Sequence, residues 1–116
     1  KCNIALVGIG NVDEGSTLYK HKFLGKDEKD LIKSKGGVVD ICFIPFNING
    51  EIVETEISNR IIGIDATSLI DIPLVIGVAG GEEKKNTVLG ALKSGLLNVI
   101  ITDSDTASYV LESMHN

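Results

Sequence analysis

An acidic residue, Asp40, lies inside an apolar segment, residues 38–46, which otherwise has the composition of a buried strand. A carboxylate at such a place has to be solvated, paired, or located at the edge of a sheet. The functional interpretation is that it accepts hydrogen bonds from sugar hydroxyl groups or acts as a general base. The alternative is that it hydrogen-bonds a neighbouring backbone N–H at the start of the strand, and the sequence leaves both open.

Gly80 and Gly81 precede a predicted helix and would suit the binding of an anion. Glycines let backbone N–H groups approach a ligand closely, and the N-terminus of a helix carries partial positive charge. Lys84 and Lys85 follow in the expected first turn, where the helix dipole disfavours a cation. This placement indicates a function, although an ordinary turn with solvated lysines is the alternative.

Small and charged residues also follow two other apolar segments. Gly8 and Gly10 follow the first, but they do not complete a dinucleotide-binding fingerprint, because Asp13 occupies the third glycine's place and no helix follows directly. Asp103 follows the last segment, where it can either contact a ligand or cap the final helix. Arg60, the single arginine, can pair with a phosphate or carboxylate, or form a surface ion pair.

Other kinds of catalytic or metal site are not indicated. The cysteines, Cys2 and Cys42, lack the spacing of a zinc site and are expected to be reduced, buried thiols in the cytoplasm. His21 and His115 have no acidic or cysteine partner at a useful spacing and are expected at the surface. Neither a P-loop nor a G-x-S-x-G motif is present. We therefore expect no metal, no cofactor and no nucleophilic catalysis.

The elements that must position these residues are short apolar strands separated by helices. Helices are expected over residues 27–34, 82–94 and 103–114. The strand segments are nearly continuous and rich in β-branched residues, which is typical of parallel strands covered by helices on both faces. These segments are residues 4–8, 38–46, 74–79 and 98–102. The pattern predicts an α/β fold with a three-layer, Rossmann-like, mostly parallel sheet, whose ligands bind where the strands end.

Two segments between these elements carry turn and loop signals. Asn49 and Gly50 form a strong turn signal, which predicts a hairpin between residues 43–48 and 51–56. Residues 9–25 show no periodicity and are expected to form a long loop, and loops of that length are usually functional or mobile.

Length and charge limit the possible functions. The 116 residues fit one domain, and a hydrophobic content of 43% suffices for a core. A net charge of −5 argues against contact with nucleic acid, which requires a basic face. No apolar segment approaches the ~18 residues of a membrane span. Because the chain lacks an initiating Met, we expect it to be part of a longer protein.

A series of motifs, taken in order, resembles the sugar-binding domain of the SorC family of bacterial transcriptional regulators. These motifs are residues 6–10, 37–41, 60–64, 72–73, 78–84 and 97–103. The resemblance implies the fold shared by ribose-5-phosphate isomerase, glucosamine-phosphate deaminase and the coenzyme A transferases. It also implies an N-terminal helix-turn-helix that binds DNA, a C-terminal domain that binds a phosphorylated sugar, and oligomerisation, with operator affinity altered by the ligand.

The resemblance also implies roles for individual residues. Asp40 matches the acidic residue of a Gly-x-x-x-Asp-Ile motif, which would accept sugar hydroxyls. Lys84 matches the lysine of Gly-Gly-x-x-Lys, after Gly80 and Gly81, which would meet the phosphate or other oxygens of the ligand. Further matching positions are the glycines of the first strand end and the acid of the Thr-Asp pair, namely Gly8, Gly10 and Asp103.

The match departs from the family pattern at two positions and covers only part of the family's domain. Val39 stands where the family often has Gly, and Ser104 stands where it usually has Glu. The match begins about halfway through the domain, so the first half, with its phosphate-binding loop, and the helix-turn-helix are expected outside residues 1–116. The expected function is a non-enzymatic effector-binding module. The alternatives are a sugar-phosphate isomerase, with Asp40 as base and Lys84 as electrostatic stabiliser, and an oligomerisation fragment without its own ligand.

Overall fold

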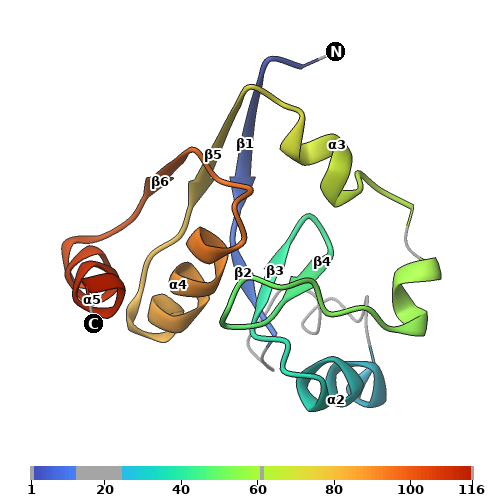
Figure 1. Cartoon of the computed structure of the whole chain (residues 1–116). Coiled ribbons are helices and arrows are strands. Elements are labelled where there is room, and N and C mark those ends of the chain that lie inside the picture. The colour runs from blue at the N-terminus through green and yellow to red at the C-terminus, as the bar shows by residue number, and fades with distance from the viewer. Residues whose placement is uncertain (1, 13–24, 61, 116) are drawn as a thin grey trace.

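The computed structural model describes residues 2–12, 25–60 and 62–115, and its main element is a parallel sheet of three strands (Figure 1). The strands are β1 (Ile4–Gly8), β5 (Leu74–Val78) and β6 (Val99–Ile101), in the order β1-β5-β6. All pairings in this sheet are parallel. The α/β class with a mostly parallel, Rossmann-like main sheet is therefore confirmed, as are three of the four predicted strands, each within one residue at either end.

The remaining predicted strand, residues 38–46, is wrong as a single strand. It is a hairpin of β3 (Val39–Ile41) and β4 (Ile44–Phe46), which forms an antiparallel sheet with β2 (Gly10–Asn11). The turn consists of Cys42 and Phe43, whose φ angles of 52° and 65° lie in the left-handed region that tight hairpin turns require. β2 also replaces the beginning of the predicted loop 9–25, of which residues 13–24 lie outside the described part of the chain.

The hairpin predicted between residues 43–48 and 51–56 is confirmed at its turn and wrong at its second strand. The Asn47 side chain accepts hydrogen bonds from the backbone N–H groups of Asn49 (2.9 Å) and Glu51 (3.0 Å), which closes the turn. Beyond it, a single bridge joins Phe46 and Ile52, and the chain continues into the 3-10 helix η1 (Glu56–Arg60).

The predicted helices are confirmed with shifted ends. They are α2 (Lys26–Ser34), α4 (Lys85–Lys93) and α5 (Ser104–His115), and a short helix that the sequence did not predict, α3 (Ala66–Ile70), precedes β5. The expected first turn of α4 is instead the 3-10 helix η2 (Glu82–Lys84). None of the described helices has the length and apolar character that a membrane span requires.

The core lies on one face of the parallel sheet, where α4, α5 and the small antiparallel sheet pack (Figure 1). Gly90 lets α4 approach β3 closely, since a Cβ atom there would lie 2.7 Å from a methyl group of Val39. Val39, Phe46 and Val88 are almost completely buried at this junction. Within the described residues the opposite face of the parallel sheet carries no helix, and its side chains Ile4 and Leu6 are exposed.

Candidate functional site

The candidate site lies at the edge of the parallel sheet where all three strands end. The backbone N–H of Ile9 donates to the carbonyl of Val78 (3.3 Å), and that of Ala79 donates to the carbonyl of Ile101 (3.1 Å), so the three strand ends are held together. The structure brings to this edge the seven residues for which the family resemblance implies a ligand role. These residues are Gly8, Gly10, Asp40, Gly80, Gly81, Lys84 and Asp103.

Lys84 reaches across this edge, because it closes the turn η2 instead of standing in the first turn of α4. Gly81 begins that turn with a φ of 111°, a conformation that favours glycine, and its carbonyl accepts the backbone N–H of Lys84 (3.0 Å). The Lys84 ammonium group donates to the backbone carbonyl of Ile9 (2.8 Å) and is partly buried. The interpretation as a solvated surface lysine is therefore wrong. An ammonium group carries three N–H donors, so two remain for a ligand.

Asp40 lies on β3 directly opposite Gly10 on β2. A Cβ atom on Gly10 would lie 3.6 Å from a carboxylate oxygen of Asp40, so the two residues are in close contact. Burial raises the pKa of the Asp40 carboxyl from 3.8 to about 6. No described residue donates a hydrogen bond to this carboxylate, and the alternative in which it binds a neighbouring backbone N–H is wrong for the described part of the chain. The carboxylate is thus desolvated and still able to accept hydrogen bonds.

Asp40 and Lys84 are therefore both next to the Ile9–Gly10 dipeptide. Lys84 is bonded to Ile9, and Asp40 stands opposite Gly10, the next residue along the chain. Together they offer a partly buried acceptor and a cationic donor beside backbone that carries no bulky side chain at Gly10. Such a pair suits a ligand with hydroxyl groups to donate and oxygen atoms to accept.

The carboxylate of Asp103 accepts hydrogen bonds from within the protein. One of its carboxylate oxygens accepts the backbone N–H of Gly81 (2.7 Å), and the other accepts the backbone N–H of Thr106 (2.8 Å). These bonds, the one from Gly81 first, lower the pKa of Asp103 to about 2. The predicted cap of the final helix is confirmed. The Gly81 N–H, which the sequence suggested for a ligand anion, binds this internal carboxylate instead.

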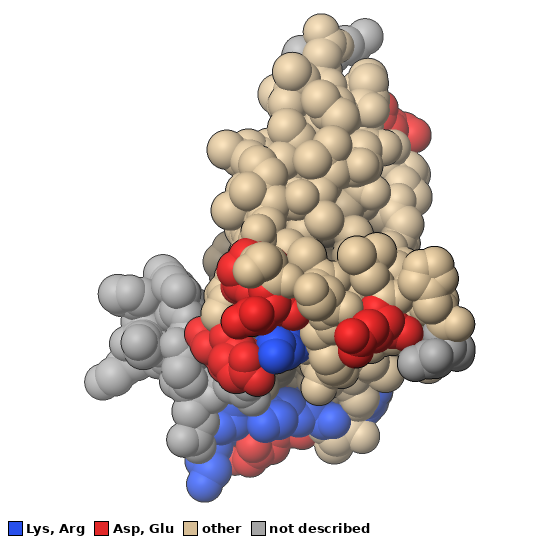
Figure 2. All heavy atoms as spheres, turned by 90° about the vertical axis from the view of Figure 1, so that its left-hand side faces the viewer, with Lys and Arg blue, Asp and Glu red and all other residues tan. Residues whose placement is uncertain are grey.

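Acidic side chains surround this part of the edge. Glu82, Glu83 and Asp105 are exposed near Asp103, and Figure 2 shows acidic side chains gathered in the middle of that face of the molecule. Lys85 forms an ion pair with Glu82 (2.9 Å), and this hydrogen bond raises the pKa of Lys85. Its ammonium also lies 5.9 Å from the centre of the Tyr109 ring. Lys85 thus pairs with Glu82 and Tyr109, whereas Lys84 reaches across the edge to Ile9.

The remaining residues that the sequence singled out lie away from this edge or outside the described residues. Cys2 is exposed, so the prediction of a buried thiol is wrong there, because β1 begins only at Ile4. Cys42 is partly buried, and burial followed by the charge of Asp40 raises the pKa of its thiol. His115 is exposed in the last turn of α5, and His21 lies outside the described residues. Arg60 ends η1.

Two polar groups at the edge carry no signal in the sequence. The hydroxyl group of Thr102 is buried and makes no hydrogen bond within the described residues, and that of Thr106 is buried beside the Asp103 carboxylate. Both residues flank Asp103, one at the end of β6 and one in the first turn of α5. Among the described residues, no group of three His, Cys, Asp or Glu side chains is arranged to hold a metal ion.

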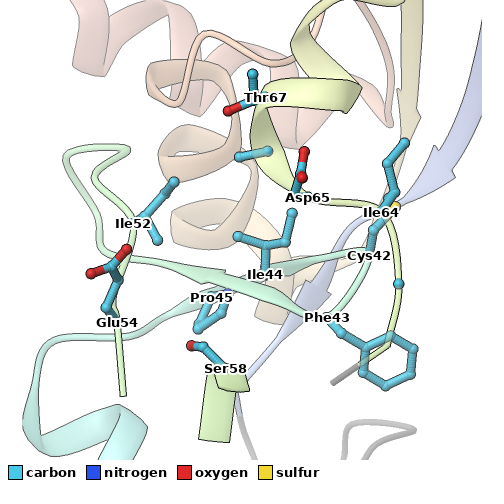
Figure 3. Close-up of a pocket in the computed structure, with 12 residues that line it drawn as sticks. Cys42, Phe43, Ile44, Pro45, Ile52, Glu54, Ser58, Ile64, Asp65 and Thr67 are labelled. Carbon is cyan, nitrogen blue, oxygen red and sulfur yellow. The ribbon is translucent and has the colours of Figure 1, made fainter. Parts of the chain in front are cut away.

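A separate cavity of about 320 Å³ lies between the Cys42–Phe43 turn and the beginning of α3 (Figure 3). Its walls are partly apolar, with Ile44 and Ile52 among them, and carry the carboxylates of Glu54 and Asp65. Asp65 accepts the backbone N–H of Ser68, which lowers the pKa of its carboxyl. None of the described lining residues is basic. This cavity is therefore unsuited to a phosphorylated ligand, and the strand-end edge is the better candidate.

The parallel sheet with polar residues at the carboxyl ends of its strands places the chain among the ligand-binding domains of the Rossmann-like α/β class. The family model "Putative sugar-binding domain" matches residues 1–112. The chain belongs to this family, the sugar-binding domain of SorC-type transcriptional regulators, and the resemblance seen in the sequence is confirmed.

Individual relatives agree with this assignment. The chain is 34% identical over 110 residues to the sorbitol operon regulator of Klebsiella pneumoniae, covering 95% of this chain and 35% of that protein. It is 38% identical over 114 residues to the transcriptional regulator LsrR of Escherichia coli O139:H28, covering 96% of this chain and 36% of that protein. The chain thus spans about a third of the length of the curated relatives it matches.

Solved structures show the same arrangement. A transcriptional regulator from Streptococcus pneumoniae superimposes with a TM-score of 0.87 at 31% identity, covering 98% of this chain and 44% of that chain. The full-length sorbitol operon regulator SorC of Klebsiella pneumoniae gives a TM-score of 0.84 at 33% identity, covering 94% of this chain and 35% of that chain. A "Putative Sugar-Binding Domain of Transcriptional Repressor" from Vibrio fischeri gives a TM-score of 0.87 at 33% identity, covering 100% of this chain and 47% of that chain.

Proposed function

We propose that the chain forms part of the effector-binding domain of a bacterial transcriptional regulator and that it binds a phosphorylated sugar at the strand-end edge. The observation that carries this proposal is the pair formed by Asp40 and Lys84 on either side of Ile9 and Gly10. One member is a partly buried carboxylate without a donor among the described residues, and the other is a lysine with two N–H donors that Ile9 does not use. A ligand with hydroxyl groups and anionic oxygens satisfies both.

The two residues act on different parts of the ligand. The ionised carboxylate of Asp40 accepts hydrogen bonds from one or two sugar hydroxyls, and charge-assisted bonds of this kind are stronger than neutral ones. The ammonium of Lys84 donates to the phosphate or to a sugar oxygen while its bond to Ile9 keeps it in place.

The proposal also concerns the complete regulator, of which this chain is one part. Relatives about three times as long are named transcriptional regulators, which supports a helix-turn-helix elsewhere in the polypeptide as the part that binds DNA. In this proposal residues 1–116 are the second half of the sugar-binding domain, and the first half lies outside them. Ligand binding changes operator affinity and self-association, and the protein acts in the cytoplasm, where its operator is.

A thermal-shift panel of pentose and hexose phosphates on the whole regulator tests the proposal, with the unphosphorylated sugars as ligand controls. A ligand at about 100 times its Kd adds roughly 2.7 kcal/mol to the free energy of unfolding, which raises Tm by several degrees. Lys84→Ala and Asp40→Asn are expected to abolish the shift. Lys35→Ala, which removes an exposed lysine after α2, is expected to retain it. A folded protein that responds to no sugar phosphate would contradict the proposal.

One observation favours an enzyme as the second candidate. A carboxyl with a pKa of about 6 is suited to act as a general base near neutral pH, and Lys84 could stabilise the resulting enediolate of a sugar phosphate. Such an enzyme would exchange the carbon-bound proton next to the carbonyl group with solvent. Proton NMR of each binding sugar phosphate in D₂O tests this directly. Binding without exchange supports the effector role, and Asp40-dependent exchange supports an isomerase.

A further inference from the structure

The cavity between the Cys42–Phe43 turn and the beginning of α3 is separate from the strand-end edge and has the size of a ligand pocket. Its volume of about 320 Å³ is at the lower end of the range for pockets that hold small molecules. Three parts of the chain line it, namely the β3–β4 hairpin, the segment 52–58 and the segment 63–67 (Figure 3). None of the described lining residues belongs to the proposed effector site. A ligand in this cavity would therefore be a second one.

The cavity carries negative charge, and no described lining residue balances it. The carboxylate of Glu54 has no hydrogen bond or ion pair with any described residue. Asp65 accepts the backbone N–H of Ser68 (2.7 Å), which fixes its position and lowers the pKa of its carboxyl, so it is ionised at neutral pH. A carboxylate offers about four acceptor sites, so both groups can still accept hydrogen bonds from a ligand. Two carboxylates on one cavity attract a cation and repel an anion.

The remaining wall is largely apolar and includes an aromatic ring. Phe43, Ile52 and Ile64 line the cavity and are 46%, 47% and 39% exposed. Figure 3 shows Phe43 at one end of the cavity and Ile52 with Glu54 at the other. Phe43 has a φ of 65°, a conformation that glycine adopts without steric cost, so the turn keeps an exposed aromatic side chain at an unfavourable position. The face of an aromatic ring attracts organic cations.

We propose that this cavity is a second ligand site and that it binds an aliphatic diamine, a small molecule with an apolar chain and an ammonium group at each end. The apolar chain packs against Ile44 and Ile52, and the ammonium groups donate to Glu54 and Asp65, which lie on different sides of the cavity (Figure 3). Other ligand classes fit less well. A neutral apolar molecule would desolvate the carboxylates without bonding them. Among the described residues, no group of three His, Cys, Asp or Glu side chains is arranged for a metal ion.

Isothermal titration calorimetry of the whole regulator with putrescine and cadaverine tests the proposal, with the neutral diol of the same chain length as the ligand control. We expect saturable one-to-one binding of a diamine and no binding of the diol. Glu54→Gln and Asp65→Asn each remove one charge-assisted hydrogen bond and are expected to weaken binding about tenfold. Asparagine still caps α3, so Asp65→Asn is expected to fold. Glu56→Gln removes an exposed carboxylate outside the cavity and is the matched control, with an affinity expected within about twofold of wild type.

Thiol labelling locates the diamine, because Cys42 lines the cavity whereas Cys2 is exposed outside it. A bound diamine is expected to slow the reaction of Cys42 with iodoacetamide at least about fivefold and to leave that of Cys2 unchanged, as measured by peptide mass spectrometry. If one charge variant does not fold, the other gives the same comparison.

Three results would overturn the proposal. They are the absence of saturable diamine binding up to about 1 mM, a loss of affinity in Glu56→Gln as large as in Glu54→Gln, and diamine binding that leaves the labelling of Cys42 unchanged. The second result would mean that the diamine is attracted only by the general negative charge of the protein. None of these measurements depends on a sugar phosphate, so they stand apart from the test of the proposed function.

Discussion

Replacing Asp40 with asparagine is expected to make the protein more stable. Burial raises the pKa of this carboxyl from 3.8 to about 6, and a shift of that size corresponds to about 3 kcal/mol. Because the folded pKa is the higher one, the folded state binds the proton more tightly. Stability is therefore greatest below pH 3.8 as far as Asp40 is concerned, and it falls as the pH rises to about 6. Above that range the full cost of the buried charge remains.

Asparagine has nearly the same shape and carries no charge, so Asp40→Asn removes this cost. At pH 8 we expect the free energy of unfolding to rise by up to about 3 kcal/mol, or roughly 10 °C in Tm for a domain of this size. At pH 5 the gain is expected to be about half as large, because the wild-type carboxyl is then largely protonated in the folded state. Urea denaturation of both proteins at pH 5 and pH 8 measures the two differences.

Asp71→Asn provides the matched control, since it removes an exposed carboxylate at the end of α3. It is expected to change stability by less than about 0.5 kcal/mol at either pH. A loss of stability in Asp40→Asn at pH 8, or a gain that is the same at both pH values, would refute the reasoning. The loss of stability would mean that the carboxylate has a donor in the folded protein, and the pH-independent gain would mean that its pKa is not raised by burial. The same variant is expected to lose its response to sugar phosphates, so stability and ligand binding change in opposite directions.

The other predictions concern the turn that carries Lys84. Lys84→Met keeps the length of the side chain but removes its bond to Ile9; it is expected to cost about 1 kcal/mol in urea denaturation and to abolish the ligand-induced thermal shift. Gly81→Ala places a side chain at a φ of 111° and is expected to cost at least about 1 kcal/mol and to weaken ligand binding measured by calorimetry. Asp103→Asn is expected to lower Tm near neutral pH, and the difference should disappear as the pH falls from about 4 towards 2, where wild-type Asp103 loses its charge. Equal differences across that range would contradict the assigned hydrogen bonds.

The position of the site could be predicted from the sequence because it depends on a general property of parallel sheets. Short, continuous apolar segments identified β1, β5 and β6, and the residues that follow such strands have to meet at one edge. Gly8, Gly80 and Asp103 lie at that edge for this reason alone.

The hairpin that carries Asp40 could not be predicted in the same way. Residues 38–46 are apolar almost throughout, and the turn within them has Cys42 and Phe43 at left-handed φ angles instead of the expected glycine or asparagine. A turn of this composition has no local signal, so its position is fixed by tertiary packing of Val39, Ile41 and Phe46 in the core. The prediction of one strand failed because continuous apolar composition describes two adjacent core strands equally well.

The sequence also could not show which charged residues at the edge have hydrogen-bond partners in the protein, because these partners are far apart in the chain. Asp103 and Asp40 both looked like ligand carboxylates. Asp103 is satisfied by the backbone N–H groups of Gly81 and Thr106, and its pKa falls to about 2, whereas Asp40 has no described donor and its pKa rises to about 6. A carboxylate that already accepts hydrogen bonds within the protein gains little free energy from the donors of a ligand. A desolvated carboxylate without such bonds gains the most. The contrast is explained if Asp103 holds the Lys84 turn in place, and it supports the proposal that Asp40 is the carboxylate that meets the ligand.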